Sequence, residues 1–151
     1  GGGKWSPTDS GRVRVQGIEA SLERPLPWLA KWSLSGAYAY RKATTHSGSA
    51  AEQGKQLIAR PYHQGSATLM YRASSFDAGL TATAVGDRYT TAANTQRLGS
   101  YLTLDLTAHW RYDQRDSLTL ELRNLTNATY QAVEGYPLPG FECRVAATRK
   151  F

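Results

Sequence analysis

The sequence predicts an all-β protein: an antiparallel, up-and-down meander of about seven strands that forms one segment of a transmembrane β-barrel. Three observations carry this prediction. Apolar and polar side chains alternate along seven stretches, short and long connections alternate between them, and large aromatic side chains gather at one end. With 40% hydrophobic and 20% charged side chains and 14 glycines, the 151 residues suit a chain whose alternate side chains meet an apolar phase.

The first predicted strand covers residues 13–22. Its apolar positions begin with Val13 and Val15 and then shift phase at Gly17 to Ile18, Ala20 and Leu22. A phase shift at a glycine is typical of a β-bulge. We therefore expect a bulge at Gly17.

The next three predicted strands cover residues 32–41, 64–72 and 76–84. Every second side chain in each is apolar or glycine, and the positions between are mostly small or polar, as in a strand with one apolar face. The apolar faces are Trp32, Leu34, Gly36, Tyr38 and Tyr40; Gly65, Ala67, Leu69 and Tyr71; and Phe76, Ala78, Leu80, Ala82 and Ala84.

The last three predicted strands cover residues 102–112, 117–123 and 141–151. Residues 102–112 alternate strictly, and this length matches the ~9–11 residues that a tilted strand needs to cross a bilayer. The polar faces of these strands carry Asp105, Arg111, Glu121, Arg123 and Arg144, a set that suits a hydrogen-bonded wall facing a water-filled lumen.

The connections between the strands alternate in length. Residues 24–31, 73–75 and 113–116 are short turns, whereas residues 42–62, 86–101 and 124–140 are long loops. Outer-membrane barrels have short periplasmic turns and long extracellular loops, while a soluble β-sandwich has no reason to collect its long loops at one end. The pattern therefore favours a barrel.

Aromatic side chains on the apolar faces collect at the short-turn end, where a membrane–water interface would lie. Tyrosine and tryptophan favour this interface because one edge of the ring is apolar and the other can be hydrated. Tyr38, Tyr40 and Phe141 form a weaker group near the other end. The predicted interface aromatics are Trp32, Tyr71, Phe76, Trp110, Tyr112 and Phe151.

Composition excludes several functions. No run of 18 apolar residues is present, so a transmembrane helix is not expected. The net charge of +6 comes from scattered arginines and lysines, so we expect no nucleic-acid partner. The spacing of His46, His63 and His109 is not that of metal ligands, so we expect no metal or cofactor site. Asp105 and His109 are ~13 Å apart along one strand, which is too far for a catalytic contact, so we expect no catalytic site.

The segment from residue 124 to the end carries a motif. It contains Asn124-Leu125-Thr126-Asn127, then Tyr130-Gln131, then Gly135-Tyr136-Pro137 with Pro139-Gly140, and a strand ending in Phe151. Two sequons within it, at Asn124 and Asn127, are expected to make local turn hydrogen bonds. This segment resembles the closing part of TonB-dependent outer-membrane receptors, in the branch of cobalamin and siderophore receptors. Weaker agreement lies in Val15-Gln16-Gly17-Ile18-Glu19 and Arg60-Pro61-Tyr62-His63.

The resemblance implies a 22-stranded barrel with a plug domain, driven by TonB, in the bacterial outer membrane. On this interpretation residues 1–151 are the C-terminal barrel segment, residues 1–10 are a tag or loop remnant, and the plug is absent. The intact receptor would take up cobalamin or an iron siderophore, and the fragment alone would not transport. Two alternatives stay open: a small outer-membrane barrel that acts as an enzyme or adhesin, and a soluble β-sandwich binding module.

The resemblance also implies partners and sites. The ligand contacts are expected in the extracellular loops, with Arg88, Tyr89, Arg97 and Tyr136 as candidates. Val145, Ala147 and Phe151 would form the signal that the outer-membrane assembly machinery reads by strand pairing. Other expected partners are the lipid bilayer with its lipopolysaccharide, the plug and TonB. The fragment is expected to self-associate because its two edge strands are unpaired.

Overall fold

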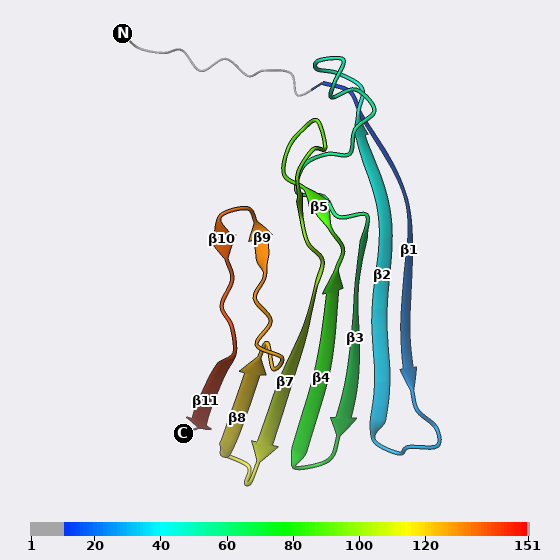
Figure 1. Cartoon of the computed structure of the whole chain (residues 1–151). Helices are drawn as coiled ribbons and strands as arrows, with labels where there is room; N and C mark the ends of the chain where they lie inside the picture. The colour runs from blue at the N-terminus through cyan, green and yellow to red at the C-terminus, as the bar shows by residue number, and fades with distance from the viewer. Residues whose placement is uncertain (1–10, 151) are drawn as a thin grey trace.

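The computed structural model describes residues 11–150. It confirms an antiparallel meander of seven strands in the order β1-β2-β3-β4-β7-β8-β11 (Figure 1). The strands are β1 (Val13–Pro25), β2 (Trp32–Thr45), β3 (His63–Arg72), β4 (Phe76–Val85), β7 (Tyr101–Arg111), β8 (Asp116–Arg123) and β11 (Glu142–Arg149).

Two small hairpins within the long loops were not predicted. β5 (Arg88–Tyr89) pairs with β6 (Arg97–Leu98), and β9 (Gln131–Val133) pairs with β10 (Tyr136–Pro137). Strands of two or three residues are too short to show an apolar–polar period. Hydrogen bonds between loop segments, rather than local sequence, therefore define these hairpins.

The register sorts the side chains onto two faces, as the alternation predicted. Between β4 and β7, for example, Leu80 lies opposite Leu106 on the apolar face and Thr81 lies opposite Asp105 on the polar face. Within the described residues there is one sheet layer, and the buried hydrophobic residues are the two alanines Ala39 and Ala43. A soluble sandwich would bury its apolar face against a second sheet, so this alternative does not fit.

The predicted bulge at Gly17 is wrong. β1 and β2 pair without interruption from Val13 opposite Thr45 to Pro25 opposite Ser33. Val13 and Val15 therefore lie on the polar face, opposite to the face of Ile18. A Cβ at position 17 would lie 2.3 Å from the Tyr40 carbonyl oxygen, so glycine allows the close approach of β2.

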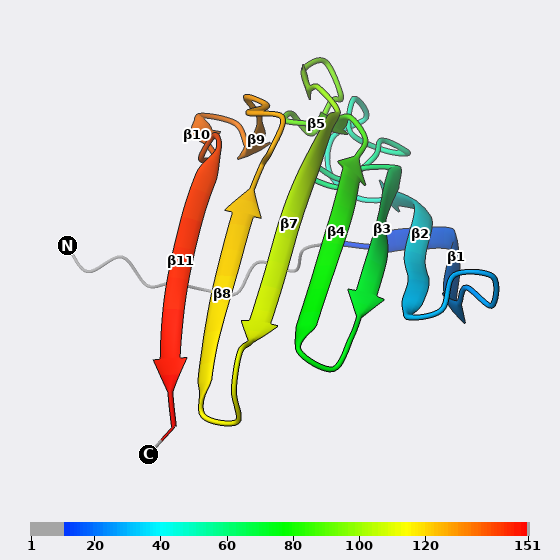
Figure 2. The same cartoon turned by 90° about the horizontal axis from the view of Figure 1, so that it is seen from below.

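The short connections, residues 26–31, 73–75 and 112–115, lie at one end of the sheet and the long loops at the other (Figure 1). Figure 2 shows that the sheet is twisted and open, with β1 and β11 at its two edges. Among the described residues, no helix has the length and apolar character needed to cross a membrane.

Candidate functional site

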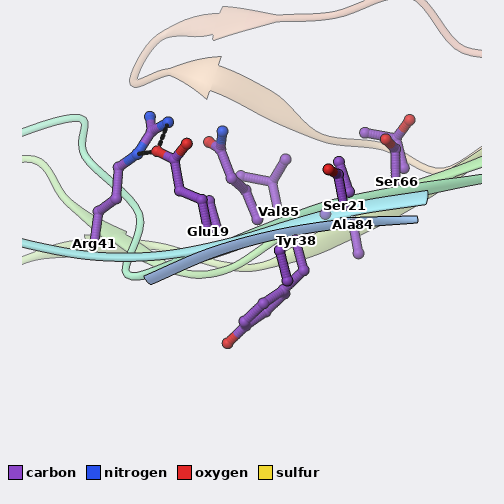
Figure 3. A pocket seen from close by; sticks show the side chains of 13 residues that line it. Glu19, Ser21, Tyr38, Arg41, Ser66, Ala84 and Val85 are labelled. Atoms are coloured by element: carbon purple, nitrogen blue, oxygen red, sulfur yellow. Dashed lines mark hydrogen bonds and ion pairs between the residues drawn. The ribbon is translucent and has the colours of Figure 1, made fainter. Parts of the chain in front are cut away.

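A polar wall covers one face of the sheet and is hollowed over β1–β4. The hollow has a volume of about 460 Å³. The Arg41 Nε donates a hydrogen bond to Glu19 Oε1 at 2.9 Å, and Ser21 and Ser66 continue the polar surface. Figure 3 shows these four side chains on one face and the Tyr38 ring on the opposite face. The wall thus presents charged and hydroxyl groups on one face of the sheet.

Further along the sheet, two ion pairs lie on the same wall, one between β7 and β4 and one within β8. Arg111 Nη1 lies 2.6 Å from Asp77 Oδ2, and Arg123 Nη2 lies 3.4 Å from Glu121 Oε2. Arg111 also donates to the carbonyl oxygen of Ala73 at 3.1 Å. These ion pairs agree with the predicted hydrogen-bonded wall for the arginines of β7 and β8.

The geometry does not build a catalytic pair from Asp105 and His109. Asp105 Oδ1 accepts a hydrogen bond from the Asn124 backbone N at 2.8 Å, while His109 Nδ1 lies 3.0 Å from the Thr119 hydroxyl. Each side chain is thus engaged with a different partner. Across the described ranges, no three His, Cys, Asp or Glu side chains gather as ligands for a metal ion.

A buried glutamine that sequence reasoning missed ties the loop of residues 46–62 to the sheet and to the next loop. Gln56 is 2% exposed, and its Oε1 accepts a hydrogen bond from the Ala43 N at 2.9 Å. The Gln56 N donates to Asn94 Oδ1 at 2.8 Å, and Asn94 Nδ2 donates back to the Gln56 carbonyl at 2.9 Å. This reciprocal pair joins segments 38 residues apart; a polar residue in a loop gives no sequence signal for it.

Arg88 joins the loop of residues 86–100 to the β9–β10 hairpin. Its guanidinium is buried, with the whole residue 3% exposed, and its Nε donates to the Ala132 carbonyl at 3.0 Å. The carbon at the centre of the guanidinium lies 5.4 Å from the centroid of the Tyr101 ring, and that ring lies 4.4 Å from the Tyr130 ring. Arg88 therefore positions the loops, and its placement favours this role over direct contact with a ligand.

The other predicted ligand residues are more accessible. The Arg97 side chain is 61% exposed and pairs with Asp87 at 2.7 Å, and this hydrogen bond raises the pKa of Arg97. The Arg97 guanidinium also lies 5.6 Å from the Tyr89 ring centroid. Tyr136 in the β9–β10 hairpin is 72% exposed. The structure places Tyr89 and Arg97 together and Tyr136 on a separate hairpin.

Burial of the tyrosines between the loops changes their acidity. Desolvation raises the pKa of Tyr62, with a smaller contribution from neighbouring Tyr89. Desolvation likewise raises the pKa of Tyr130, which lies against Tyr101. Both rings pack between the loops: Tyr62 stacks on Tyr40 with ring centroids 6.4 Å apart, and Tyr130 lies against Tyr101.

The motif residue Asn124 forms a buried corner at the end of β8. Its Nδ2 donates to the carbonyls of Ala128 and Pro139 at 2.8 and 3.2 Å, and its Oδ1 accepts from the Ala128 N at 2.9 Å. Its φ of +49° is one that asparagine tolerates better than most residues. The predicted local turn hydrogen bonds of Asn124 are confirmed. Leu125 follows with its N donating to the Leu104 carbonyl at 2.8 Å.

The rest of the motif completes this corner. Asn127 Oδ1 accepts from the Phe141 N at 2.9 Å, and a Cβ on Gly140 would lie 2.4 Å from that same oxygen. Gly135 has φ +81°, which suits the turn between β9 and β10. The loop thus returns to the sheet through backbone and amide contacts. The remaining motif residues Tyr130, Tyr136, Pro137 and Pro139 lie along the same loop.

The predicted interface aromatics form a continuous row at the short-turn end. Trp32 and Tyr71 have ring centroids 5.2 Å apart, and Tyr71 and Phe76 6.3 Å apart. Phe76 is opposite Trp110 in the register, and the Trp110 and Tyr112 rings lie 5.7 Å apart. Contact with lipid headgroups stays a prediction for this row.

Two predicted assembly residues, Val145 and Ala147, lie on the apolar face of the edge strand β11, opposite Leu120 and Leu118 of β8. Phe151, the third of them, lies outside the described residues, as does the predicted remnant of residues 1–10. The other side of β11 pairs with no described strand, which leaves its backbone available to a partner.

Residues 1–127 match the family of TonB dependent receptor-like β-barrels. The chain belongs to this family. Its members are outer-membrane β-barrels, so the open sheet is a wall segment of such a barrel and its apolar face is the lipid-facing one.

Among known proteins, the chain is 26% identical over 151 residues to the vitamin B12 transporter BtuB of Photobacterium profundum, covering 99% of this chain. It spans 23% of that relative's length. Its fold is similar to that of the ferric citrate transporter FecA, with a TM-score of 0.83 and 17% identity over 93% of this chain and 25% of FecA. It is also similar to that of the siderophore receptor PiuA of Acinetobacter baumannii, with a TM-score of 0.75 and 21% identity over 89% of this chain and 21% of PiuA.

Proposed function

We propose that this chain is the C-terminal barrel segment of an outer-membrane receptor for the TonB-driven uptake of cobalamin or an iron siderophore. The observation that carries the proposal is the family match over residues 1–127, together with an alignment to a vitamin B12 transporter along nearly the whole chain. The named relatives are transporters and receptors, not enzymes. The plug and TonB contacts would come from the remainder of such a receptor.

Seven strands with two free edges do not enclose a pore, so the segment alone would not transport. Membrane spanning by strands requires every backbone group to be paired, which only a closed barrel achieves. We expect the edge strands β1 and β11 to pair with other strands of the full receptor. The polar wall would then line the lumen and face the plug.

The ligand class is tested by uptake. A strain lacking the full receptor gene is compared with the complemented strain for uptake of radiolabelled cyanocobalamin and of ferric siderophores. We expect uptake of one ligand to disappear with the gene, and again in the complemented strain when TonB is removed. Unchanged uptake of both ligand classes would refute the proposal.

The loops at the far end are proposed to contact that ligand, through Tyr89, Arg97 and Tyr136. Exposed tyrosine and arginine side chains are frequent in binding hot spots, where removal costs more than ~1 kcal/mol. We expect Tyr136→Ala in the full receptor to raise the ligand Kd by about tenfold. Tyr112→Ala, at the opposite end of the sheet, is the matched control. An equal Kd for both variants would remove Tyr136 from the binding site.

Val145, Ala147 and Phe151 are proposed as the signal for the assembly machinery. The free edge of β11 suits recognition by strand addition, in which backbone groups pair and alternate side chains give specificity. Replacing Phe151 by Ser in the full receptor should lower the amount of folded receptor in the outer membrane. Membrane levels equal to the wild type would show that Phe151 is not part of this signal.

A further inference from the structure

We propose that the β5–β6 hairpin locks the three long loops into one body that moves as a unit. Arg88 and Asn94 are the positioning residues of this lock, one toward each neighbouring loop. Through them the lock holds Tyr89 and Arg97 in a fixed place relative to Tyr136. The lock does not depend on the transported ligand, whereas its effect on ligand binding rests on the proposed function.

The β5–β6 hairpin lies between the other two long loops (Figure 1 and Figure 2). On one side, the Tyr89 carbonyl oxygen accepts a hydrogen bond from the Ala59 N at 2.8 Å. On the other side, Arg88 Nε donates to the Ala132 carbonyl oxygen at 3.0 Å. Among the described residues, no hydrogen bond joins the two outer loops directly. The hairpin is therefore the link between them.

The two joints are one residue apart in the chain. Arg88 and Tyr89 together make up β5, which pairs with β6. Consecutive Cα atoms are held ~3.8 Å apart by a planar peptide, so a strand of two residues cannot shift at one position and stay in place at the other. Loss of one joint should therefore loosen the other.

The joint with the loop of residues 46–62 holds a backbone that is unfavourable on its own. Ala59 has φ +55° and Asn94 has φ +58°. Asparagine tolerates this region, but an alanine Cβ crowds the following carbonyl oxygen there. Such conformations persist where surrounding contacts hold them. The bond from the Ala59 N to Tyr89 and the reciprocal pair of Gln56 and Asn94 are contacts of this kind.

The joint with the β9–β10 hairpin is held by a buried cation. Within residues 11–150, Arg88 has no carboxylate at ion-pair distance, and its buried Nη2 has no hydrogen-bond partner. Its other nitrogens donate to the carbonyl oxygens of Ala132 and Gly99. Because a buried charge is costly without partners, the hairpin cannot move away from Arg88 unless the guanidinium becomes hydrated. Separation of the two loops is therefore an all-or-none event.

The test is amide hydrogen exchange of the full receptor in detergent, followed by mass spectrometry. Arg88→Met removes the donors of one joint and keeps an unbranched side chain. Asn94→Gly removes the amide of the other joint and keeps a residue that accepts positive φ. The matched control is Arg97→Met, because Arg97 is an exposed arginine of the same hairpin whose hydrogen bond stays within its own loop, at Asp87.

We expect Arg88→Met to speed exchange about tenfold in residues 130–138 and also in residues 55–60, to which Arg88 makes no hydrogen bond. Asn94→Gly should speed exchange in both segments as well, and Arg97→Met in neither. The lock is overturned if each variant affects only the loops that its side chain contacts, or if the control has the same effect. A heat-modifiable band on gels shows that each variant is folded; Asn94→Gly decides the question if Arg88→Met does not fold.

The effect on binding is measured with cyanocobalamin and, in parallel, with ferric citrate. In the Arg88→Met background, Tyr136→Ala should raise the Kd by less than about twofold, because Tyr136 is no longer held beside the β5–β6 hairpin. An equal rise in both backgrounds would overturn the positioning role of Arg88. If Tyr136→Ala changes the Kd in neither background, the proposed ligand contact is wrong, and the exchange experiment still decides the lock.

Discussion

Asn124 shows how one side chain can hold a long loop on a barrel wall. Its amide bonds two segments of the loop of residues 124–141, and its backbone N bonds Asp105 on β7. Asn124 is 3% exposed. A backbone group that lost its hydrogen bond to this side chain could therefore not bond to water instead. The motif that carries the family resemblance is therefore first a structural corner.

We expect Asn124→Ala to lower the free energy of unfolding of the full barrel by about 2–3 kcal/mol, from lost hydrogen bonds and unpaired buried carbonyls. Denaturant unfolding in detergent measures this change. Thr129→Ala, an exposed position of the neighbouring sequon, is the control and should have little effect. Equal stability of the Asn124 variant and the control would show that the corner does not hold the loop.

At the scale of elements, the turns and the aromatic row fix the short-turn end. Asp113 closes the β7–β8 turn, where its Oδ1 accepts hydrogen bonds from the N atoms of Arg115 and Asp116 at 2.7 and 2.6 Å. The rings from Trp32 to Tyr112 run across four neighbouring strands, β2, β3, β4 and β7, at that end. The Asp113 turn is held by hydrogen bonds between residues two and three apart in sequence. The aromatic row instead depends on strand register, because it joins residues that strand pairing brings together.

The two backbone hydrogen bonds hold the pKa of Asp113 below its ordinary value. A carboxyl with a lowered pKa in the folded state stabilises that state above the unfolded-state pKa, and the contribution is lost as pH falls through the folded-state pKa. Below about pH 4, wild-type stability should therefore fall more steeply than that of Asp113→Asn, which does not titrate. Thermal melts across pH measure this; parallel curves would contradict it.

Trp110 tests the aromatic row. It is half-exposed in the sheet, and its burial in the interface should stabilise the embedded barrel. We expect Trp110→Ala to destabilise the full barrel in lipid bilayers by about 1–3 kcal/mol. Trp28, 76% exposed in the first turn and outside the row, provides the control substitution Trp28→Ala. If both variants unfold at the same temperature, the row has no special role at the interface.

At the scale of the whole molecule, the sheet is open and nearly without a core. Among residues 11–150, β1 and β11 each pair on one side only, and the lipid-facing side exposes large apolar residues such as Ile18 at 70%. Unpaired strand edges and exposed apolar surface both favour association. The fold is that of a wall whose stability depends on neighbouring strands and lipid.

The 151-residue chain refolded in detergent should therefore self-associate through β1 and β11. Light scattering coupled to size-exclusion chromatography should give masses of two or more copies after subtraction of the detergent. Proline substitutions at Val15 and Val145 in the edge strands should shift the distribution toward the monomer, because proline cannot donate to a ladder. A monodisperse monomer of the unchanged chain would contradict this expectation.

The strands, most of their faces and the alternation of connections could be predicted from the sequence, because period-two patterns and the ~10-residue length needed to cross a bilayer are local properties. It also located the aromatic rings that turned out to be neighbours in a row. It misassigned the face of Val13 and Val15, since two valines before a glycine look like an apolar face, and only pairing with β2 shows their side.

The contacts that join the loops form only in the folded chain. Gln56 and Asn94, or Arg88 and the Ala132 carbonyl, are polar groups far apart in the chain whose hydrogen bonds follow no sequence period. The local alternation of side chains thus specifies the sheet, whereas long-range hydrogen bonds specify how the loops are arranged at its end.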